Sequence, residues 1–309
     1  MKLTYLKHSE IDKNKWEYAI LNAINGNLYA YAWYLDIVSP QWDALVSDNY
    51  EIVIPLTVKK MLGFNTLQQP LFTQQLGVFT TNAINLNKTE EYIQQVVELF
   101  SYCNFQVNKH NILNLQNSTK FTVLNKINYE LDLIPSYKYL SSKYHTNTKR
   151  NIAKARSNEL ILKINDINSQ TFVDFIRKNV GFKVAQLKNK DYKKMLQIIK
   201  FAEKYKFGQS YSVYDDKKRL LSVAYFIFSH NKIYYLFAGN SQMGKEKRAM
   251  FFLLDEFIRT YSEKNVILDF EGSMIPGLAR YYEGFGAVAG KYQQIISNRL
   301  PYLLRWIKY

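Results

Sequence analysis

Cysteine and histidine are scarce in this sequence. The single cysteine among the 309 residues, Cys103, excludes an intramolecular disulfide, so we expect a reducing compartment such as the cytoplasm. The four histidines show no zinc-like ligand spacing and lie far apart: His8, His110, His145 and His230. We therefore expect no metal site.

Long apolar runs and low-complexity segments are missing as well. No window approaches the ~20 apolar residues that are needed to cross a bilayer. Charged residues interrupt the segment 1–16 every few positions, so we expect no signal peptide and no transmembrane segment. With 47% apolar residues, a chain of this length predicts about two globular domains that pack closely, because no flexible linker separates them.

Acidic residues are too few to balance the basic ones, and the excess positive charge lies in one block. Between Tyr137 and Lys206 there are 17 Lys and Arg against five Asp and Glu, whereas the rest of the chain has 24 basic and 21 acidic residues. Such a block attracts an anionic partner, which could be a phosphorylated ligand, RNA or a membrane surface. The alternative is a solvated helical face that keeps the protein soluble.

Hydrophobic periodicity predicts alternating helices and strands in both halves of the chain. In the first half, to about Pro135, it predicts a helix with Ser9 as its N-cap, a hairpin around the turn SDNY, a second helix and a strand. Their ranges are 9–23, 42–60, 87–103 and 121–134.

The second half is predicted to begin with helices and then to form a sheet. Helices are expected at 137–158, 169–179, 189–206, 245–264 and 276–286, and strands at 160–164, within 210–239, at 265–272 and at 292–296. The hairpins within 42–60 and 210–239 share a layout, which favours two copies of one α/β unit. Chance similarity between two hairpins is the alternative.

The stretch FAGNSQMGKEKRA, residues 237–249, nearly matches the phosphate-binding pattern G-x-x-x-x-G-K. Glu246 stands where a nucleotide hydrolase needs Ser or Thr, so it lacks the hydroxyl for magnesium and would repel phosphates. A loop followed by a helix N-terminus still binds anions through unpaired backbone N–H groups. The predicted binding residues are two glycines that admit a phosphate and three cations around it: Gly239, Gly244, Lys245, Lys247 and Arg248.

The stretch VILDFEGSMIPGLARYYEGFGA, residues 266–287, resembles the last part of the GNAT acyltransferase fold. With NTKRNIAKA (147–155) and YAWYLDIVSPQWDALV (31–46), the chain from about Tyr29 to Ile296 resembles FemAB-like proteins. These are tandem-GNAT proteins that include the aminoacyl transferases of peptidoglycan cross-bridge synthesis.

The resemblance implies an α/β (α+β) fold of two GNAT-like mixed-sheet domains packed around a central cleft. The domains would span 1–135 and 136–296, with the segment 297–309 as a candidate to complete the first. It also implies N-acyl transfer to an amine acceptor, for which a cell-envelope precursor is a candidate. The GNAT coenzyme loop [Q/R]-x-x-G-x-[G/A] is altered here, because Lys245 and Lys247 replace its small residues. The co-substrate is therefore either acyl-CoA or aminoacyl-tRNA, with no tightly bound cofactor.

Three residues near the end of this stretch are the catalytic candidates. Asp269 and Glu271 should point to one face of a strand, where they could orient or deprotonate an amine. The alternative is that they cap the next helix or pair with Arg280. Tyr282 matches the position at which many GNAT enzymes keep the tyrosine that protonates the leaving thiolate. Among 25 tyrosines, packing in the core is its alternative role.

The basic block supplies the remaining candidates. Lys149, Arg150 and Lys154 lie close together on a predicted helix and could bind a pyrophosphate or the end of a tRNA. A non-catalytic RNA-binding protein, which stacks bases on the tyrosines between these lysines, is the competing interpretation. A degenerate GNAT pair that acts as a scaffold is a third.

Overall fold

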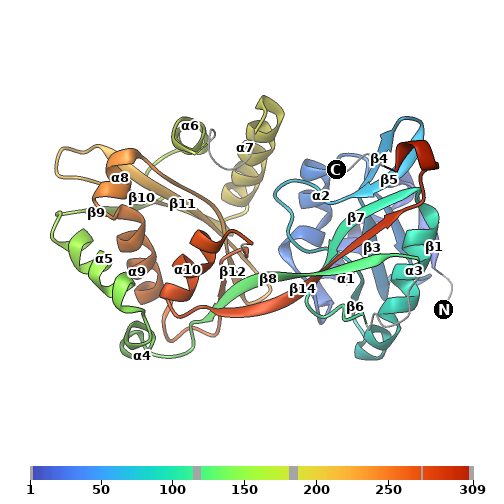
Figure 1. Ribbon diagram of the computed structural model, residues 1–309, viewed down its shortest axis with the longest axis horizontal. Coiled ribbons are helices and arrows are strands. Elements are labelled where there is room, and N and C mark those ends of the chain that lie inside the picture. The colour runs from blue at the N-terminus through green and yellow to red at the C-terminus, as the bar shows by residue number, and fades with distance from the viewer. Residues whose placement is uncertain (1–2, 114–119, 181–186, 273, 306–309) are drawn as a thin grey trace. The chain divides into compact units, whose positions relative to one another are not determined.

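The computed structural model describes residues 3–113, 120–180, 187–272 and 274–305. The chain forms two compact units (Figure 1). The first unit contains Met1–Lys126 and Lys291–Tyr309, and the second contains Ile127–Gly290. The chain passes between them twice, within the neighbouring strands β8 (Thr122–Asp132) and β14 (Val288–Asn298).

The first unit contains two groups of strands. Its other elements are β1 (Thr4–Leu6), η1 (His8–Glu10), α1 (Lys13–Asn22), η2 (Leu28–Ala30), α2 (Ala32–Val38), β2 (Asp43–Val46), β3 (Ile52–Leu56), β4 (Val58–Met61), β5 (Phe64–Gln68), β6 (Phe79–Thr80), η3 (Ala83–Lys88), α3 (Thr89–Leu99), β7 (Tyr102–Val107) and η4 (Tyr302–Leu304). One group, in the order β1-β2-β3-β6, is antiparallel throughout. The other has the order β4-β5-β7-β14, in which β5 and β7 are parallel.

The first helix begins later than predicted. Asp12, not Ser9, caps α1, because its carboxylate accepts the backbone N–H groups of Asn14 and Lys15. Ser9 lies in the short helix η1 instead. The predicted hairpin is confirmed, since β2 and β3 pair antiparallel on either side of residues 47–51.

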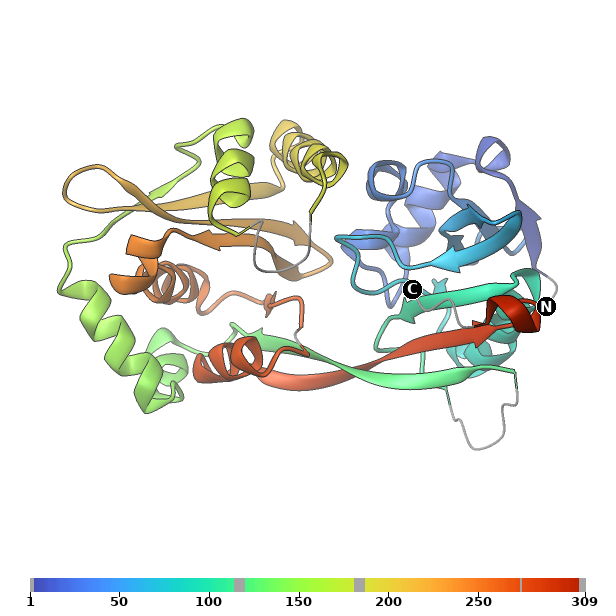
Figure 2. The same ribbon diagram turned by 45° about the horizontal axis from the view of Figure 1, so that its top comes forward.

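The second unit is a sheet with helices on both faces. Its elements are α4 (Tyr137–Ser142), α5 (Thr146–Arg156), β9 (Ile161–Ile164), α6 (Ser169–Asn179), α7 (Asn189–Lys204), β10 (Gly208–Tyr214), β11 (Leu220–Ser229), β12 (Lys232–Asn240), α8 (Gln242–Glu246), α9 (Ala249–Tyr261), β13 (Ile267–Asp269) and α10 (Pro276–Gly284). The strand order is β8-β13-β12-β11-β10-β9. Helices α6 and α7 cover one face, and α9, backed by α5, covers the other (Figure 1 and Figure 2). The prediction of mixed α/β units is confirmed.

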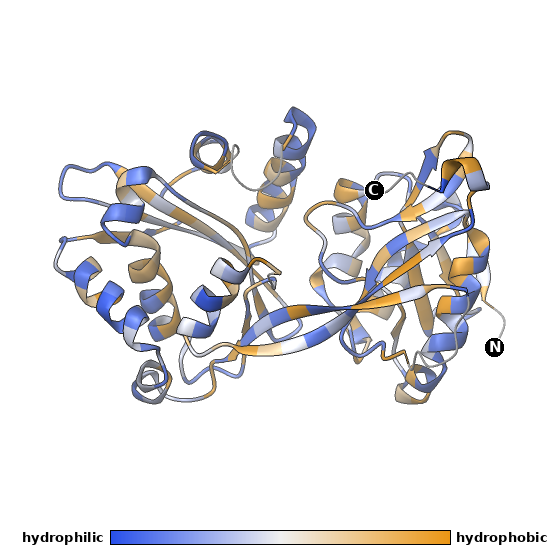
Figure 3. Ribbon diagram, viewed as in Figure 1, coloured by the Kyte–Doolittle hydropathy of each residue, from blue (hydrophilic) through white to orange (hydrophobic). Residues whose placement is uncertain are grey.

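Helix α9 builds the core of the second unit. Leu253, Leu254, Phe257 and Ile258 are fully buried, and the Phe257 ring stacks on Phe226 of β11 with their centroids 3.7 Å apart. By contrast, α5 presents mostly hydrophilic residues (Figure 3). In the part of the chain that the structure describes, no helix is both long and apolar enough to cross a bilayer.

The helix predicted for 245–264 is two helices. Ser241 caps α8 by accepting the Gly244 N–H, and α9 starts only after Arg248, whose φ of 62° interrupts the helical path. A Cβ at Gly244 would lie 2.3 Å from the carbonyl oxygen of Leu221. This glycine therefore lets α8 pack against β11, and the expectation of an open loop ahead of Lys245 is wrong.

Candidate active site

The site lies where two parallel strands of the second unit part. β12 pairs with β13 only through Lys232, Ile233 and Tyr234, whereas its pairing with β11 continues to Asn240. A register shift leaves Leu236 as an extra residue in β12, a β-bulge. Beyond Tyr234, β12 therefore has an edge of backbone N–H and C=O groups that β13 does not pair.

A cavity of about 590 Å³, called the strand-edge cavity below, occupies this gap. It is lined by Asn179, Val180, Tyr235, Leu236, Ala238, Gly239, Asn240, Gly244, Lys245, Arg248, Met250, Phe251, Phe270, Glu271, Gly272, Gly277, Leu278, Tyr281 and Tyr282. The lining combines cations from α8 and the start of α9 with aromatic rings from β12, α9 and α10. Such a mixture of apolar walls and a few polar groups is typical of a ligand site.

Four of the five residues predicted to hold an anion line this cavity: Gly239, Gly244, Lys245 and Arg248. Lys247 does not, because its ammonium faces the β10–β11 turn, 3.8 Å from Asp215 and 3.7 Å from Asp216. Gly239 is also needed for packing, since a Cβ there would lie 2.8 Å from Ile176 of α6. Anion binding by these residues stays a prediction.

Arg248 is the cation best placed to meet a ligand. One guanidinium nitrogen donates to the Lys245 carbonyl at 3.0 Å, whereas its buried Nε has no hydrogen-bond partner in the described part of the chain. The Arg248 side chain, at the N-cap position of α9, does not cap the first amides of that helix. A buried donor and uncapped helix amides favour an acceptor-rich or anionic ligand at this end of the cavity.

The two candidate carboxylates do not share a strand face, so that prediction is wrong. Strand β13 ends at Asp269, and Glu271 has a φ of 63°, which breaks the alternation of side chains. Asp269 is buried and outside the cavity lining, where its carboxylate accepts from Asn128 and the Glu271 N–H, both at 3.0 Å, and from Lys232 at 3.1 Å. Glu271 lines the cavity. Asp269 thus fixes the backbone turn that presents Glu271.

Tyr282 also lines the cavity and is 7% exposed. Its ring stacks on Phe270 with centroids 4.8 Å apart. Burial, with a smaller contribution from the charge of Glu271, raises the pKa of Tyr282 well above its ordinary value. The phenol is therefore protonated at neutral pH and can donate a hydrogen bond or, as a weaker acid than an exposed tyrosine, a proton.

The basic cluster on α5 is not part of this cavity. Lys149 donates to the Ser142 carbonyl at 2.8 Å, Arg150 donates to Asn147 at 2.9 Å, and Lys154 is exposed. These residues lie on the exposed surface of the helix that backs α9. Their predicted role with an anionic substrate has no support from the cavity and stays a prediction.

Sequence reasoning missed the apolar part of the site, namely Tyr235, Phe251, Phe270, Leu278 and Tyr281. The buried Tyr281 hydroxyl has no hydrogen-bond partner among residues 3–113, 120–180, 187–272 and 274–305. The sequence signal for this apolar wall was the presence of five large apolar residues in β12, α9 and the segment from Phe270 to α10. It was not decisive, because such residues usually belong to a core. Among the described residues, no group of three or more His, Cys, Asp and Glu could hold a metal ion.

Comparison with known proteins places this geometry in a fold. No family model matches the chain, and no curated protein matches its sequence. Among solved structures, FemX matches with a TM-score of 0.70 and 11% identity, over 99% of this chain and 100% of FemX. The chain has a FemX-like fold.

Other structures with the FemX-like fold match as well. L-PGS from Bacillus licheniformis has a TM-score of 0.57 and 10% identity, over 96% of this chain and 94% of its own. A GNAT-family acetyltransferase from Colwellia psychrerythraea has a TM-score of 0.54 and 12% identity, over 96% and 100%. The predicted FemAB-like, mixed α/β fold is therefore confirmed, at identities that concern the fold alone.

Proposed function

We propose that this chain is an N-acyltransferase that moves an acyl or aminoacyl group from an activated donor to an amine. The observation that carries the proposal is the strand-edge cavity in a FemX-like fold. It combines an end suited to anions, at Lys245 and Arg248, with a carboxylate and a protonated phenol, Glu271 and Tyr282.

The cationic end would bind the phosphate-bearing part of the donor. The first amides of α9 and the Nε of Arg248 can donate to phosphate oxygens, and Lys245 adds charge. The open edge of β12 would hold the acyl-bearing arm by backbone hydrogen bonds. Acyl-CoA and aminoacyl-tRNA both have such a phosphate-bearing part, and both remain candidate donors.

The transfer itself would be a direct attack. The amine nitrogen forms a bond to the acyl carbon, an amine proton passes to Glu271, and the bond from carbon to the leaving sulfur or oxygen breaks. Tyr282 gives its proton to that leaving atom. Backbone N–H groups of β12 near the bulge at Leu236 could stabilise the tetrahedral oxyanion. No covalent enzyme intermediate is needed.

A donor panel tests binding first. Acetyl-CoA, longer acyl-CoAs and charged tRNA are compared in thermal unfolding, and a true donor raises the midpoint in a concentration-dependent way. Arg248→Gln should weaken this stabilisation, whereas Glu246→Gln should not, because Glu246 is exposed and outside the cavity lining.

Single-turnover transfer to an amine acceptor tests the chemistry. We expect Glu271→Gln and Tyr282→Phe each to slow transfer by about 100-fold or more, with donor binding unchanged. Tyr281→Phe is the matched control for the loss of a phenol from the same wall. Full activity in both Glu271→Gln and Tyr282→Phe would contradict the proposal.

RNA binding without catalysis is the second candidate. It is favoured by the exposed lysines of α4 and α5, among which Tyr139 is 54% exposed. The double charge reversal Lys149→Glu and Lys154→Glu should abolish RNA binding under this candidate. Transfer that survives this double variant but not Glu271→Gln would favour the enzyme.

A further inference from the structure

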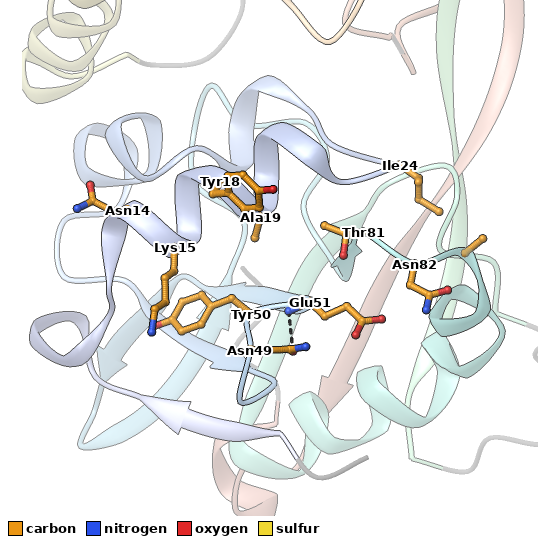
Figure 4. Close-up of a pocket in the computed structure, with 11 residues that line it drawn as sticks. Asn14, Lys15, Tyr18, Ala19, Ile24, Asn49, Tyr50, Glu51, Thr81 and Asn82 are labelled. Atoms are coloured by element: carbon orange, nitrogen blue, oxygen red, sulfur yellow. Dashed lines mark hydrogen bonds between the residues drawn. The ribbon is translucent and has the colours of Figure 1, made fainter.

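A second cavity, of about 880 Å³, lies within the first unit. Three segments line it, and we call it the turn cavity: α1 and the residue Ile24 beyond it, the β2–β3 turn, and the segment that follows β6 (Figure 4). Its lining residues are Asn14, Lys15, Tyr18, Ala19, Ile24, Asn49, Tyr50, Glu51, Thr81, Asn82 and Ala83.

Hydrogen bonds hold the three segments of the turn cavity together. The Asp12 N–H donates to the Tyr50 hydroxyl at 3.0 Å, which ties the start of α1 to the turn. The Thr81 N–H donates to the Glu51 carbonyl at 3.2 Å, which ties the turn to the segment after β6. The cavity is therefore formed before any ligand arrives, as is usual for small-molecule sites.

Tyr50 occupies a strained backbone position in this cavity. Its φ is 58°, a left-handed conformation that turns usually give to Gly or Asn and that costs a bulky residue about 1–2 kcal/mol. Its side chain offsets part of the cost by accepting the Asp12 N–H, and the ammonium of Lys15 lies 6.0 Å above its ring. The turn thus places an aromatic ring in the cavity lining at a position where glycine would have less backbone strain.

Two asparagines offer amide N–H groups to the cavity. The side-chain oxygen of Asn49 accepts the Glu51 N–H, and that of Asn82 accepts the Ile84 N–H, both at 3.1 Å. Because the oxygens are used by the backbone, each amide nitrogen is left to donate. Neither nitrogen makes a hydrogen bond within the described part of the chain.

The remaining groups balance each other in charge. Lys15 and Glu51 contribute one positive and one negative charge, and Glu51 already accepts from Asn85 at 2.8 Å through one carboxylate oxygen. Above them, Tyr18 is 70% exposed and Ile24 is 50% exposed. Figure 4 shows Tyr18 on α1 and, on a separate segment, the turn that carries Tyr50 and Glu51.

We propose that the turn cavity binds a neutral saccharide. Sugar hydroxyl groups both donate and accept hydrogen bonds, which suits a cavity with amides, a carboxylate and a lysine. The C–H faces of a sugar ring also pack on tyrosine rings. A phosphate ligand would meet the charge of Glu51, and a lipid chain would leave the amides without partners. This binding does not depend on acyl transfer.

Titration calorimetry with the full chain tests the proposal. Cellobiose, maltose and N,N′-diacetylchitobiose are the probes, and inorganic pyrophosphate and a lysine-containing tripeptide are the competitors. We expect saturable binding of at least one saccharide and none of the competitors. Tyr18→Ala should weaken it about 10-fold or more, whereas Leu21→Ala should not, because Leu21 is 63% exposed on the same helix but outside the lining.

A second variant keeps the result independent of folding at α1. Asn49→Asp preserves the oxygen that accepts the Glu51 N–H but removes the amide donor, so it should weaken saccharide binding while circular dichroism stays unchanged. Absence of binding by all three sugars would overturn the proposal. So would sugar binding that tolerates both Tyr18→Ala and Asn49→Asp, or tighter binding of pyrophosphate or tripeptide.

Discussion

Each unit contains a parallel strand pair, β5–β7 in the first and β12–β13 in the second, and the two pairs differ in what lies beyond the paired residues. In the first unit, β5 and β7 pair through Thr66–Gln68, and the chain that leaves β5 then stays beside β7. The Leu76 N–H donates to the Gln106 carbonyl at 2.9 Å, and the Asn108 N–H donates to the Leu76 carbonyl at 2.8 Å. In the second unit, nothing in β13 pairs with β12 beyond Tyr234, and the strand-edge cavity lies there.

The edge beyond a parallel strand pair can thus be covered by the same chain or left open to a ligand. Backbone groups at a strand edge need partners. The segment 69–76 supplies partners to β7 in the first unit, whereas β13 supplies none to β12 beyond Tyr234. We therefore propose that the candidate chemistry belongs to the second unit. Variants at each strand pair test whether one is open and the other closed.

The largest effect is expected at the base of the open pair. Lys232 is partly buried beside Asp269 and Glu130. Burial disfavours its charge, but Asp269, Tyr234 and Glu130 together outweigh that and raise the pKa of Lys232 above its ordinary value. Lys232→Ala leaves Asp269 charged and buried, so urea unfolding should show a loss of about 4 kcal/mol.

Lys247→Ala is the control for this variant, because Asp215 keeps its pairing with Arg219 when Lys247 is removed. We expect a loss below about 1 kcal/mol there. Equal losses in the two variants would show that the buried pair does not hold β12 and β13 together.

The next effect tests the closed pair. Gly77 has a φ of 100°, and a Cβ would lie 2.3 Å from Asn111 Oδ1 and 2.9 Å from Val107. Gly77→Ala therefore strains the segment that covers β7, and we expect a loss of about 3 kcal/mol in urea unfolding. Gly290→Ala, where a Cβ meets nothing within 4 Å, is the matched control. A stable Gly77→Ala would show that this segment is not fixed to β7.

The smallest effect is a pH dependence in the first unit. Burial raises the pKa of Glu17 to about 7, although the backbone N–H groups of Trp33 and Ala32 oppose this. Because the folded pKa lies above the unfolded one, the stabilisation is complete below the unfolded pKa and is lost as pH rises towards about 7.

Glu17→Gln keeps the oxygen that accepts from Trp33 and removes the charge. We expect it to gain about 2 kcal/mol over the parent at pH 8 and little at pH 4, measured by urea unfolding at both pH values. The same difference at both pH values would contradict a buried, titrating Glu17.

Much of the fold could be predicted because periodicity reports which face of an element is buried. The hairpin at 42–60 and the strands within 210–239 are examples. Helix boundaries were less certain, since both Ser9 and Asp12 are good N-caps and only the hydrogen bonds decide.

The site was predictable only in part. Tyr282 follows from the resemblance. Glu271 was predicted from strand alternation, which failed because a glutamate with a φ of 63° has no sequence signal. The glycine pattern was also misleading as a sign of a phosphate loop, because Gly244 is required for the close packing of α8 against the Leu221 carbonyl. The aromatic wall could not be separated from a core before the parting of β12 and β13 was known.

The first unit borrows β14 from late in the chain, where it pairs with β7 through Gln293–Asn298. During synthesis, β7 leaves the ribosome long before its partner exists, whereas the second unit is complete once Gly290 has emerged. Domains usually fold in the order in which they are made. Here the order should be reversed, with residues 127–290 as the earlier folding unit and a chaperone-sensitive interval before the first unit closes.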